Sequence, residues 1–309
     1  MYPWLQEVES EFAERLRGDR MAHAILLSGP AGLGKTELGR AFLAGLLCLE
    51  DSYPACGVCR SCQLLSTGAH PEGHILTFEP HPKRDGLRTE LIVDQVRRLT
   101  AALQLTNSVS RRKGALLYPA ETLNANAANA LLKTLEEPPG DAVLILVSHN
   151  PARLPATVRS RCQNLCARLP DGEVAIPWLA QAAQVAPDEA ALALEAAAGS
   201  PLKAMRIVRQ EGIEPYRALS ELLEDLRSGR CDPATALSAL GEVDPELLWS
   251  WLSLRAARET RTRLGQVSLA RDLARLQIEA DRNRALLATP VRKDLLLQDW
   301  LIQWARLSA

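Results

Sequence analysis

Residues 29–36 carry the pattern G-x-x-x-x-G-K-T, which is typical of a loop that binds phosphate groups. In such a loop the glycines let backbone N–H groups curl around a phosphate, the lysine reaches the outer phosphates, and the threonine hydroxyl can ligate Mg²⁺. An apolar run at 24–27 precedes the loop and a helical pattern over 37–49 follows it. We therefore predict a strand, a phosphate loop and a helix that can hold ATP or ADP. The residues predicted to contact the phosphates are Gly29, Gly32, Gly34, Lys35 and Thr36.

Hydrolysis needs more than a phosphate loop, because an acid at the end of a neighbouring strand must hold Mg²⁺ and a second acid usually polarises water. The strand expected there covers 115–118, and Tyr118 and Pro119 stand where an Asp-Glu pair would be. Glu121 lies past the proline, and two residues of extended chain carry a side chain about 6–7 Å onward. A nucleotide in this loop is therefore expected to be bound without being hydrolysed.

A cluster of four cysteines follows the phosphate-loop helix with the spacing C-x₇-C-x₂-C-x₂-C. Its members are Cys48, Cys56, Cys59 and Cys62. Four thiolates at short spacings can close a tetrahedral Zn²⁺ site, and Gly57 allows the turn between them. Because protein groups fill all four positions, we expect structural zinc that provides much of the folding free energy of this small insert. The alternative is four unrelated buried thiols.

The order of apolar and polar segments predicts the scaffold that positions these groups. Helical patterns alternate with apolar runs, which lie at 74–78, 115–118, 142–148 and 163–169. Strands separated by helices predict a parallel sheet covered by helices on both faces, which is an α/β fold. After Pro170 the strand patterns stop, and helical spacing such as that of Leu269, Leu273, Leu276 and Ala280 predicts a packed helical bundle.

The composition favours a helix-rich protein of two or three compact units, since 47% of the 309 residues are hydrophobic and only 4% are aromatic. A net charge of -1 argues against a wholly basic nucleic-acid-binding surface, although the short run 111–113 is basic. We find no signal peptide and no apolar stretch of the roughly 18 residues that a membrane span needs. We expect a cytoplasmic protein, in which clustered cysteines indicate metal rather than disulfides.

Two further motifs carry a resemblance to a known family. The segment N-A-L-L-K-T-L-E-E-P-P at 129–139 and the triplet Ser160-Arg161-Cys162 resemble motifs of bacterial clamp-loader subunits of the AAA+ class. With the phosphate loop and the cysteine insert, these motifs cover about the first 170 residues. The resemblance implies a RecA-like parallel sheet with a zinc insert over 1–168, a helical lid over 169–211 and an all-α collar domain for oligomerisation over 212–309.

Within that class, the missing acidic pair makes the chain similar to the delta-prime subunits of DNA polymerase III rather than to the hydrolysing gamma or tau subunits. In this family the arginine of S-R-C reaches the γ-phosphate of ATP held by the neighbouring subunit, which implies that role for Arg161. Leu202 stands where hydrolysing relatives carry a nucleotide-sensing arginine. The implied partners are the gamma/tau and delta subunits and, indirectly, the sliding clamp and primer-template DNA.

The resemblance thus implies a non-hydrolysing stator of a replication clamp loader, a component of a DNA-directed DNA polymerase assembly with no ATPase activity of its own. One alternative is an independent phosphate-loop ATPase or nucleotide kinase that uses Glu121 as a displaced metal ligand. Another alternative is a zinc-dependent DNA-binding module. For Arg161 the alternative to an arginine finger is an ordinary surface ion pair.

Overall fold

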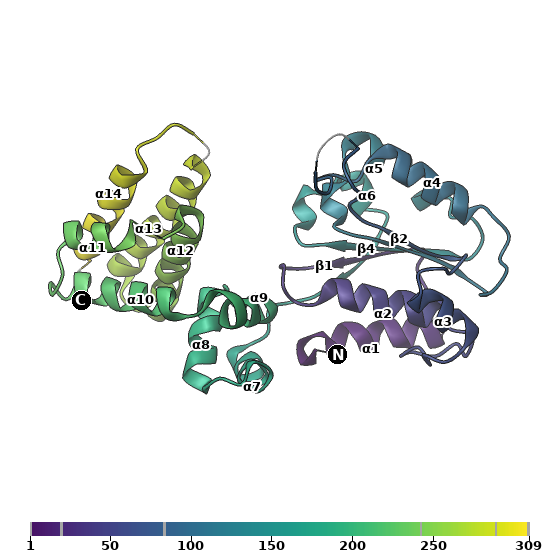
Figure 1. Cartoon of the computed structure of the whole chain (residues 1–309), viewed down its shortest axis with the longest axis horizontal. Coiled ribbons are helices and arrows are strands. Elements are labelled where there is room, and N and C mark those ends of the chain that lie inside the picture. The colour runs from purple at the N-terminus through teal and green to yellow at the C-terminus, as the bar shows by residue number, and fades with distance from the viewer. Residues whose placement is uncertain (1, 19–20, 83–84, 242, 288, 308–309) are drawn as a thin grey trace. The chain divides into compact units, whose positions relative to one another are not determined.

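The chain forms two compact units, Met1–Val174 and Ala175–Ala309. They are seen in a computed structural model that describes residues 2–18, 21–82, 85–241, 243–287 and 289–307 (Figure 1). From Ala175 onward, the helices predicted to form the lid and the collar belong to the second unit. The division of that unit into a lid and a collar stays a prediction.

A five-stranded parallel sheet organises the first unit, with the strand order β2-β3-β4-β1-β5. The strands are β1 Ala24–Ser28, β2 Gly73–Leu76, β3 Lys113–Leu117, β4 Ala142–Ser148 and β5 Gln163–Cys166. All residues of the central strands β1 and β4 are buried, as their continuous apolar sequences require in a sheet with two covered faces. The predicted α/β fold is therefore confirmed.

Helices cover both faces of this sheet (Figure 1). They are η1 Pro3–Leu5, α1 Gln6–Arg17, α2 Lys35–Leu47, α3 Arg60–Ser66, α4 Val93–Leu103, η2 Ala120–Thr122, α5 Ala125–Glu136, η3 Pro151–Arg153 and α6 Ala156–Arg159. One apolar core joins α1 and α2 to the sheet, where Phe12 stacks on Phe42 with ring centroids 3.8 Å apart. A second core joins α4, α5 and α6 to the other face. The two cores fix the sheet between its two layers of helices.

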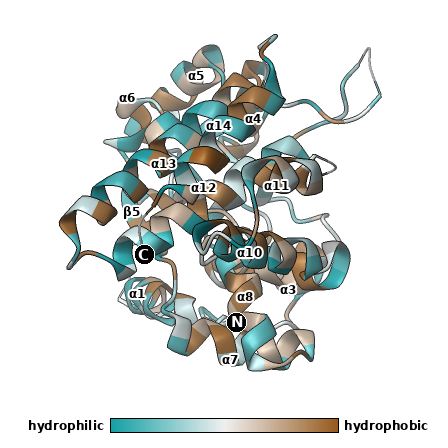
Figure 2. Cartoon of the chain, turned by 90° about the vertical axis from the view of Figure 1, so that its left-hand side faces the viewer, coloured by the Kyte–Doolittle hydropathy of each residue, from teal (hydrophilic) through white to brown (hydrophobic). Residues whose placement is uncertain are grey.

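The second unit is entirely helical among its described residues. Its elements are α7 Gly172–Ala183, whose first three residues belong to the first unit, α8 Pro187–Ala196, α9 Pro201–Arg206, the π-helix η4 Ile207–Glu211, α10 Glu214–Arg227, α11 Pro233–Leu240, α12 Pro245–Thr262, α13 Val267–Leu286 and α14 Lys293–Ala305. These helices carry both hydrophobic and hydrophilic residues along their length (Figure 2). Trp300 and Trp304 are buried and donate their indole N–H groups to the carbonyls of Leu276 and Leu223, both at 2.9 Å. Ordered partners for these donors make this a specific core rather than a loose bundle.

A network of ion pairs joins α8 to α10 and α12 in the second unit. Arg255 lies 3.6 Å from Glu195, 2.5 Å from Glu224 and 3.3 Å from Glu259. The Arg255, Glu195 and Glu259 side chains are only 11–13% exposed, so their charges are weakly screened by solvent.

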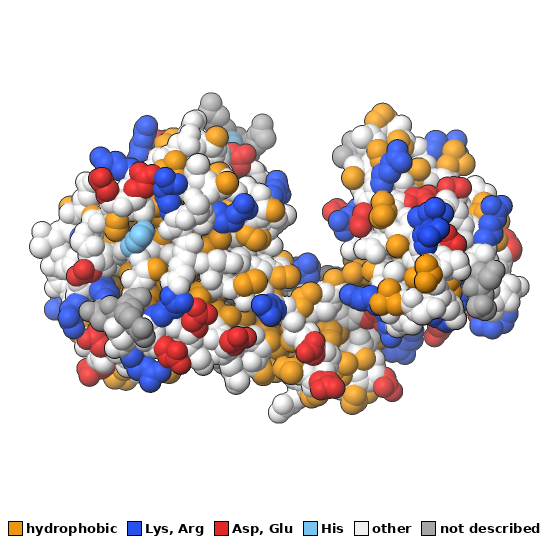
Figure 3. Space-filling view, turned by 180° about the vertical axis from the view of Figure 1, so that it is seen from behind, with side chains coloured by type: hydrophobic (Ala, Val, Ile, Leu, Met, Phe, Trp, Pro, Cys, Tyr) orange, Lys and Arg blue, Asp and Glu red, His pale blue; other side chains and the backbone are white. Residues whose placement is uncertain are grey.

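The surface carries no broad field of one charge on the face drawn in Figure 3, where basic and acidic side chains are interspersed. This distribution agrees with the net charge of -1. None of the described helices is long and apolar enough to span a bilayer.

Candidate functional site

The phosphate loop leaves β1 at Ser28 and ends at the first residue of α2. Gly29 and Gly34 adopt positive φ angles of 138° and 86°. A Cβ on Gly29 would lie 2.1 Å from the Ala167 carbonyl oxygen, and one on Gly34 would lie 2.2 Å from the Tyr2 ring. Both positions therefore require glycine. Lys35 is only 2% exposed and donates from Nζ to the Pro30 carbonyl at 2.5 Å, so the side chain lies back over the loop.

Aromatic residues near the N-terminus cover this loop, which the sequence patterns did not indicate. The Tyr2 ring contacts Gly34 and stacks on Trp4, with ring centroids 5.1 Å apart. Trp4 donates from its indole nitrogen to the Leu33 carbonyl at 2.9 Å. Burial and the nearby Glu37 carboxylate raise the pKa of Tyr2. A nucleotide in the loop would therefore have these rings as neighbours.

Tyr118 stands at the end of β3, where a hydrolysing enzyme would place an acid. The Arg40 Nη2 donates to the Tyr118 hydroxyl at 2.5 Å, and the Arg40 guanidinium carbon lies 5.4 Å from the ring centroid. Arg40 is four residues after Thr36, so the two side chains share one face of α2. The exposed Arg40 thus lies one helical turn after Thr36, on the same face of α2.

Glu121 is engaged at the end of a different strand. Its Oε1 accepts a hydrogen bond from the His149 backbone N–H at 3.0 Å. Its Oε2 is buried and has no hydrogen-bond partner among the described residues, and the same holds for the hydroxyl of Ser148. Glu121 therefore binds the backbone that follows β4.

The four clustered cysteines come together beside the C-terminal end of α2 and the start of α3. Their Sγ atoms all lie within 4.8 Å of one another, and none of the four forms a disulfide. The Sγ atoms of Cys56 and Cys62 are 3.9 Å apart, close to the roughly 3.8 Å expected between two thiolates of a tetrahedral Zn²⁺ site. The four side chains therefore fit a metal ion.

Backbone N–H groups also point at these sulfur atoms. The Cys56 N–H donates to Cys48 Sγ at 3.4 Å, and the Cys59 N–H donates to Cys56 Sγ at 3.4 Å. Burial opposes ionisation of Cys48, but hydrogen bonds from Cys56 and Ser52 outweigh it and lower the pKa of Cys48 to about 6. Burial raises the pKa of Cys62 to about 12, so a metal cation would be needed to hold all four as thiolates.

A buried polar network connects the cysteine insert to the sheet. The His70 Nε2 lies 2.8 Å from the Ser61 hydroxyl and 3.2 Å from the Ser110 hydroxyl. Both hydroxyls donate to the Leu47 carbonyl, at 2.6 and 2.8 Å. Leu47 and Ser61 precede Cys48 and Cys62, so the network fixes the backbone next to two of the thiols. His70 itself lies in a loop and is only 5% exposed.

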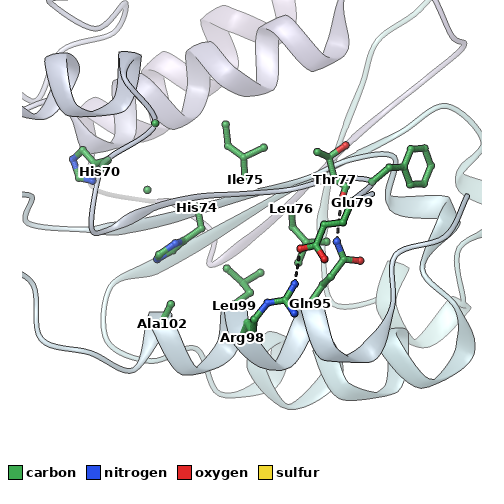
Figure 4. A pocket seen from close by; sticks show the side chains of 13 residues that line it. His70, His74, Ile75, Leu76, Thr77, Glu79, Gln95, Arg98, Leu99 and Ala102 are labelled. Atoms are coloured by element: carbon green, nitrogen blue, oxygen red, sulfur yellow. Dashed lines mark hydrogen bonds and ion pairs between the residues drawn. The ribbon is translucent and has the colours of Figure 1, made fainter. Parts of the chain in front are cut away.

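An open cavity of 450 Å³ lies between β2 and α4 (Figure 4). Its charged groups already bind one another, because Arg98 contacts Glu79 at 2.5 Å. Gln95 likewise donates to the Thr77 carbonyl at 2.8 Å. The His74 Nε2 is buried with no hydrogen-bond partner among the described residues, and burial lowers the pKa of this histidine. The cavity brings together no set of groups for catalysis.

Arg161 follows α6 and lies two residues before β5, with a side chain that is 35% exposed. Its Nε donates to the Glu136 carboxylate at 2.8 Å, so the predicted alternative of a surface ion pair is realised. Because β5 is parallel to β1 and Cys166 pairs with Ser28, Arg161 lies near the amino end of β5, whereas the phosphate loop leaves the carboxyl end of β1. Five residues of strand correspond to about 16 Å. Arg161 and the chain's own phosphate loop therefore lie at opposite ends of these two neighbouring strands.

The remaining predicted features lie apart from these groups. In the basic run, Arg111 pairs with Asp51 at 3.0 Å, while Lys113 is 9% exposed and donates to the Leu103 carbonyl at 2.6 Å. The run is therefore not a continuous basic surface. Leu202 lies on α9 in the second unit.

Comparison with known proteins gives consistent matches. Residues 4–169 match the family model described as "DNA polymerase III, delta subunit". The chain is 37% identical to the DNA polymerase III subunit delta' of Pseudomonas aeruginosa, over 99% of this chain and 98% of that protein. It is 30% identical to the subunit delta' of Escherichia coli, over 98% of this chain and 94% of that protein.

A shorter match is to a different subunit. The chain is 33% identical to the DNA polymerase III subunit tau/gamma of Haemophilus influenzae, over 51% of this chain and 22% of that protein. The full-length matches are thus to delta' subunits, and the match to a tau/gamma subunit is partial.

Proposed function

Because the chain belongs to the family of DNA polymerase III delta' subunits, we propose that it assists an ATPase neighbour in the clamp loader and does not hydrolyse ATP itself. Its full-length similarity to delta' subunits supports the clamp-loader role. Its first unit has the AAA+ type of parallel sheet. The parts that we assign to this role are Arg161, the phosphate loop and the cysteine insert.

The single observation that carries the proposal is the position of Arg161 relative to the phosphate loop. The arginine precedes the amino end of β5, and the loop follows the carboxyl end of the neighbouring parallel strand β1. The guanidinium therefore serves the ATP of another subunit. A permanently charged group with paired donors can stabilise charge on a phosphoryl group during transfer. Arg161 is the catalytic residue of this proposal, acting in trans.

The phosphate loop of the chain itself is proposed to bind ATP or ADP through the backbone of 29–34, Lys35 and Thr36. Arg40 and Tyr118 occupy the region where an acid would hold Mg²⁺. Without that acid the bound nucleotide lacks the metal that activates it. The loop then contributes to structure or regulation and not to turnover.

The cysteine insert is proposed to hold one structural Zn²⁺ through Cys48, Cys56, Cys59 and Cys62. The near-tetrahedral spacing of the thiols and the absence of a fifth donor among the described residues of the cluster support this assignment. The ion would fix α3 against the end of α2.

The proposed partners are the gamma/tau and delta subunits, with the sliding clamp and primer-template DNA as indirect partners. The partial similarity to a tau/gamma subunit supports neighbours of related fold. The helices of the collar, predicted at 212–309, would join the chain to them.

ATP turnover by the isolated chain tests the non-hydrolysing role. We expect the purified chain and its Lys35→Ala variant to show the same background rate at every Mg²⁺ concentration. Glu121→Gln should leave that rate unchanged, because Glu121 binds the His149 backbone. Robust turnover that Lys35→Ala or Glu121→Gln removes would support an independent ATPase instead.

A further inference from the structure

The guanidinium of Arg161 is held from two sides within the first unit. Its Nε donates to Glu136 Oε1 at 2.8 Å, and its Nη2 lies 2.6 Å from the same oxygen. Its Nη1 donates to the Thr157 carbonyl at 2.9 Å. These contacts use three of the five N–H groups of an arginine. One N–H on each Nη atom has no partner among the described residues, which leaves a pair of donors for a phosphate.

The Glu136 contact adds little to the stability of the fold. The Glu136 and Arg161 side chains are 51% and 35% exposed, and ion pairs between exposed side chains are weak because solvent screens them. The contact does fix the direction of the arginine, since Glu136 ends α5 and Thr157 belongs to α6. An arginine that acts on a transferring phosphoryl group must be held in one geometry.

We propose that Glu136 is a positioning residue that aims Arg161 at the ATP of the neighbouring subunit. This inference rests on the proposed role of Arg161 in trans. The carboxylate binds the Nε side of the guanidinium, so the two remaining donors can face the phosphate. The alternative is that the same contact sequesters Arg161 until a partner displaces Glu136. Removing Glu136 would then raise the ATPase rate of the loader, whereas removing a positioning residue would lower it.

The adjacent Glu137 provides a matched control. It is also exposed, and it makes no ion pair among the described residues. Glu136→Ala removes the anchor, Glu136→Gln keeps the shape and one acceptor but removes the charge, and Glu137→Ala removes a neighbouring charge only. Because both residues are exposed, the substitutions should not impair folding.

The experiment measures the DNA-stimulated ATPase of the loader reconstituted from this chain with its gamma/tau and delta subunits. We expect Glu136→Ala to cause at least about half of the loss in kcat that Arg161→Ala causes, with a change in KM for ATP below about twofold. Glu136→Gln should have an intermediate effect and Glu137→Ala none. The double variant should match Arg161→Ala, because Glu136 acts only through Arg161.

Four results would overturn the inference. A Glu136→Ala loader that turns over faster than wild type would mean sequestration. A silent Glu136→Ala beside an impaired Arg161→Ala would remove the role of Glu136 and leave the proposed function intact. A silent Arg161→Ala would remove both. A double variant slower than Arg161→Ala would show that Glu136 acts independently of the arginine.

Discussion

Arg40 donates a hydrogen bond to the Tyr118 hydroxyl at 2.5 Å, across the space between α2 and the end of β3. Tyr118 directly follows β3, the strand on which we expect a hydrolysing relative to carry its metal-binding acid. The loop at 29–36 carries its glycines, Lys35 and Thr36, so we propose a site that binds phosphate without an acid that holds Mg²⁺.

Nucleotide binding by the isolated chain should therefore depend on Lys35 and hardly on Mg²⁺. We expect Lys35→Ala to weaken ATP binding by at least about tenfold, since a charged hydrogen bond to phosphate contributes about 1.5–3 kcal/mol. Omitting Mg²⁺ should change the Kd by less than about threefold. Calorimetry with and without Mg²⁺ measures the Kd for ATP. The magnesium-free buffer contains no chelator, because a chelator would also remove metal from the cysteine cluster. ATP binding that requires Mg²⁺ would contradict the prediction.

The cysteine insert should contain one equivalent of zinc that supports the first unit. We expect Cys59→Ala to lose the metal and to lower the melting temperature of this unit by at least about 5 °C, because metal binding supplies folding free energy. Elemental analysis and thermal melting measure the two effects. Cys166→Ala, an exposed cysteine outside the cluster, is the control, and full zinc content in Cys59→Ala would refute the assignment.

His74 should make the first unit less stable in mild acid. Burial lowers the pKa of His74 in the folded chain, so the unfolded chain takes up a proton as the pH falls through the ordinary histidine value of about 6.5. Folding stability is then lost below that pH. We expect His74→Leu to be more stabilising at pH 6 than at pH 8 in urea denaturation, with the exposed His23→Leu as control. An equal effect at both pH values would exclude this role.

The ion-pair network of the second unit should be sensitive to removal of its central cation. Arg255→Met removes the cation that Glu195, Glu224 and Glu259 share, and each carboxylate keeps another arginine partner. We therefore expect a loss of about 1.5–3 kcal/mol, the contribution of hydrogen bonds to a charged group. Arg275→Met, which removes an arginine whose side chain is 71% exposed and whose partner is Asp272, should cost less than about 1 kcal/mol. Denaturant unfolding compares the two, and equal losses would argue against the network.

Local patterns predicted most of the fold. The strand predicted at 142–148 is β4 Ala142–Ser148, and the helix predicted at 37–49 is α2 Lys35–Leu47. The third strand, β3, starts at Lys113, two residues before the predicted start at 115. The charged side chain of Lys113 is buried and donates to the Leu103 carbonyl. Apolar periodicity cannot identify a buried lysine with a carbonyl partner.

The contacts of the site could not be predicted in this way. Arg40 and Tyr118 are 78 residues apart, and Arg161 and Glu136 are 25 residues apart. Such pairs depend on how strands and helices are ordered in the sheet, which spacing within one segment does not encode. The cysteine cluster was accessible from the sequence because its four thiols lie within one short segment.

The most direct test of the central claim is the clamp-loading rate of the reconstituted loader with Arg161→Ala. We expect assembly to be unchanged by size-exclusion chromatography and the loading rate to fall at least about threefold, because one ATP site loses its arginine. Arg153→Ala, an exposed arginine on η3, should load clamps at the wild-type rate. An Arg161→Ala loader that assembles and loads clamps at the full rate would contradict the account.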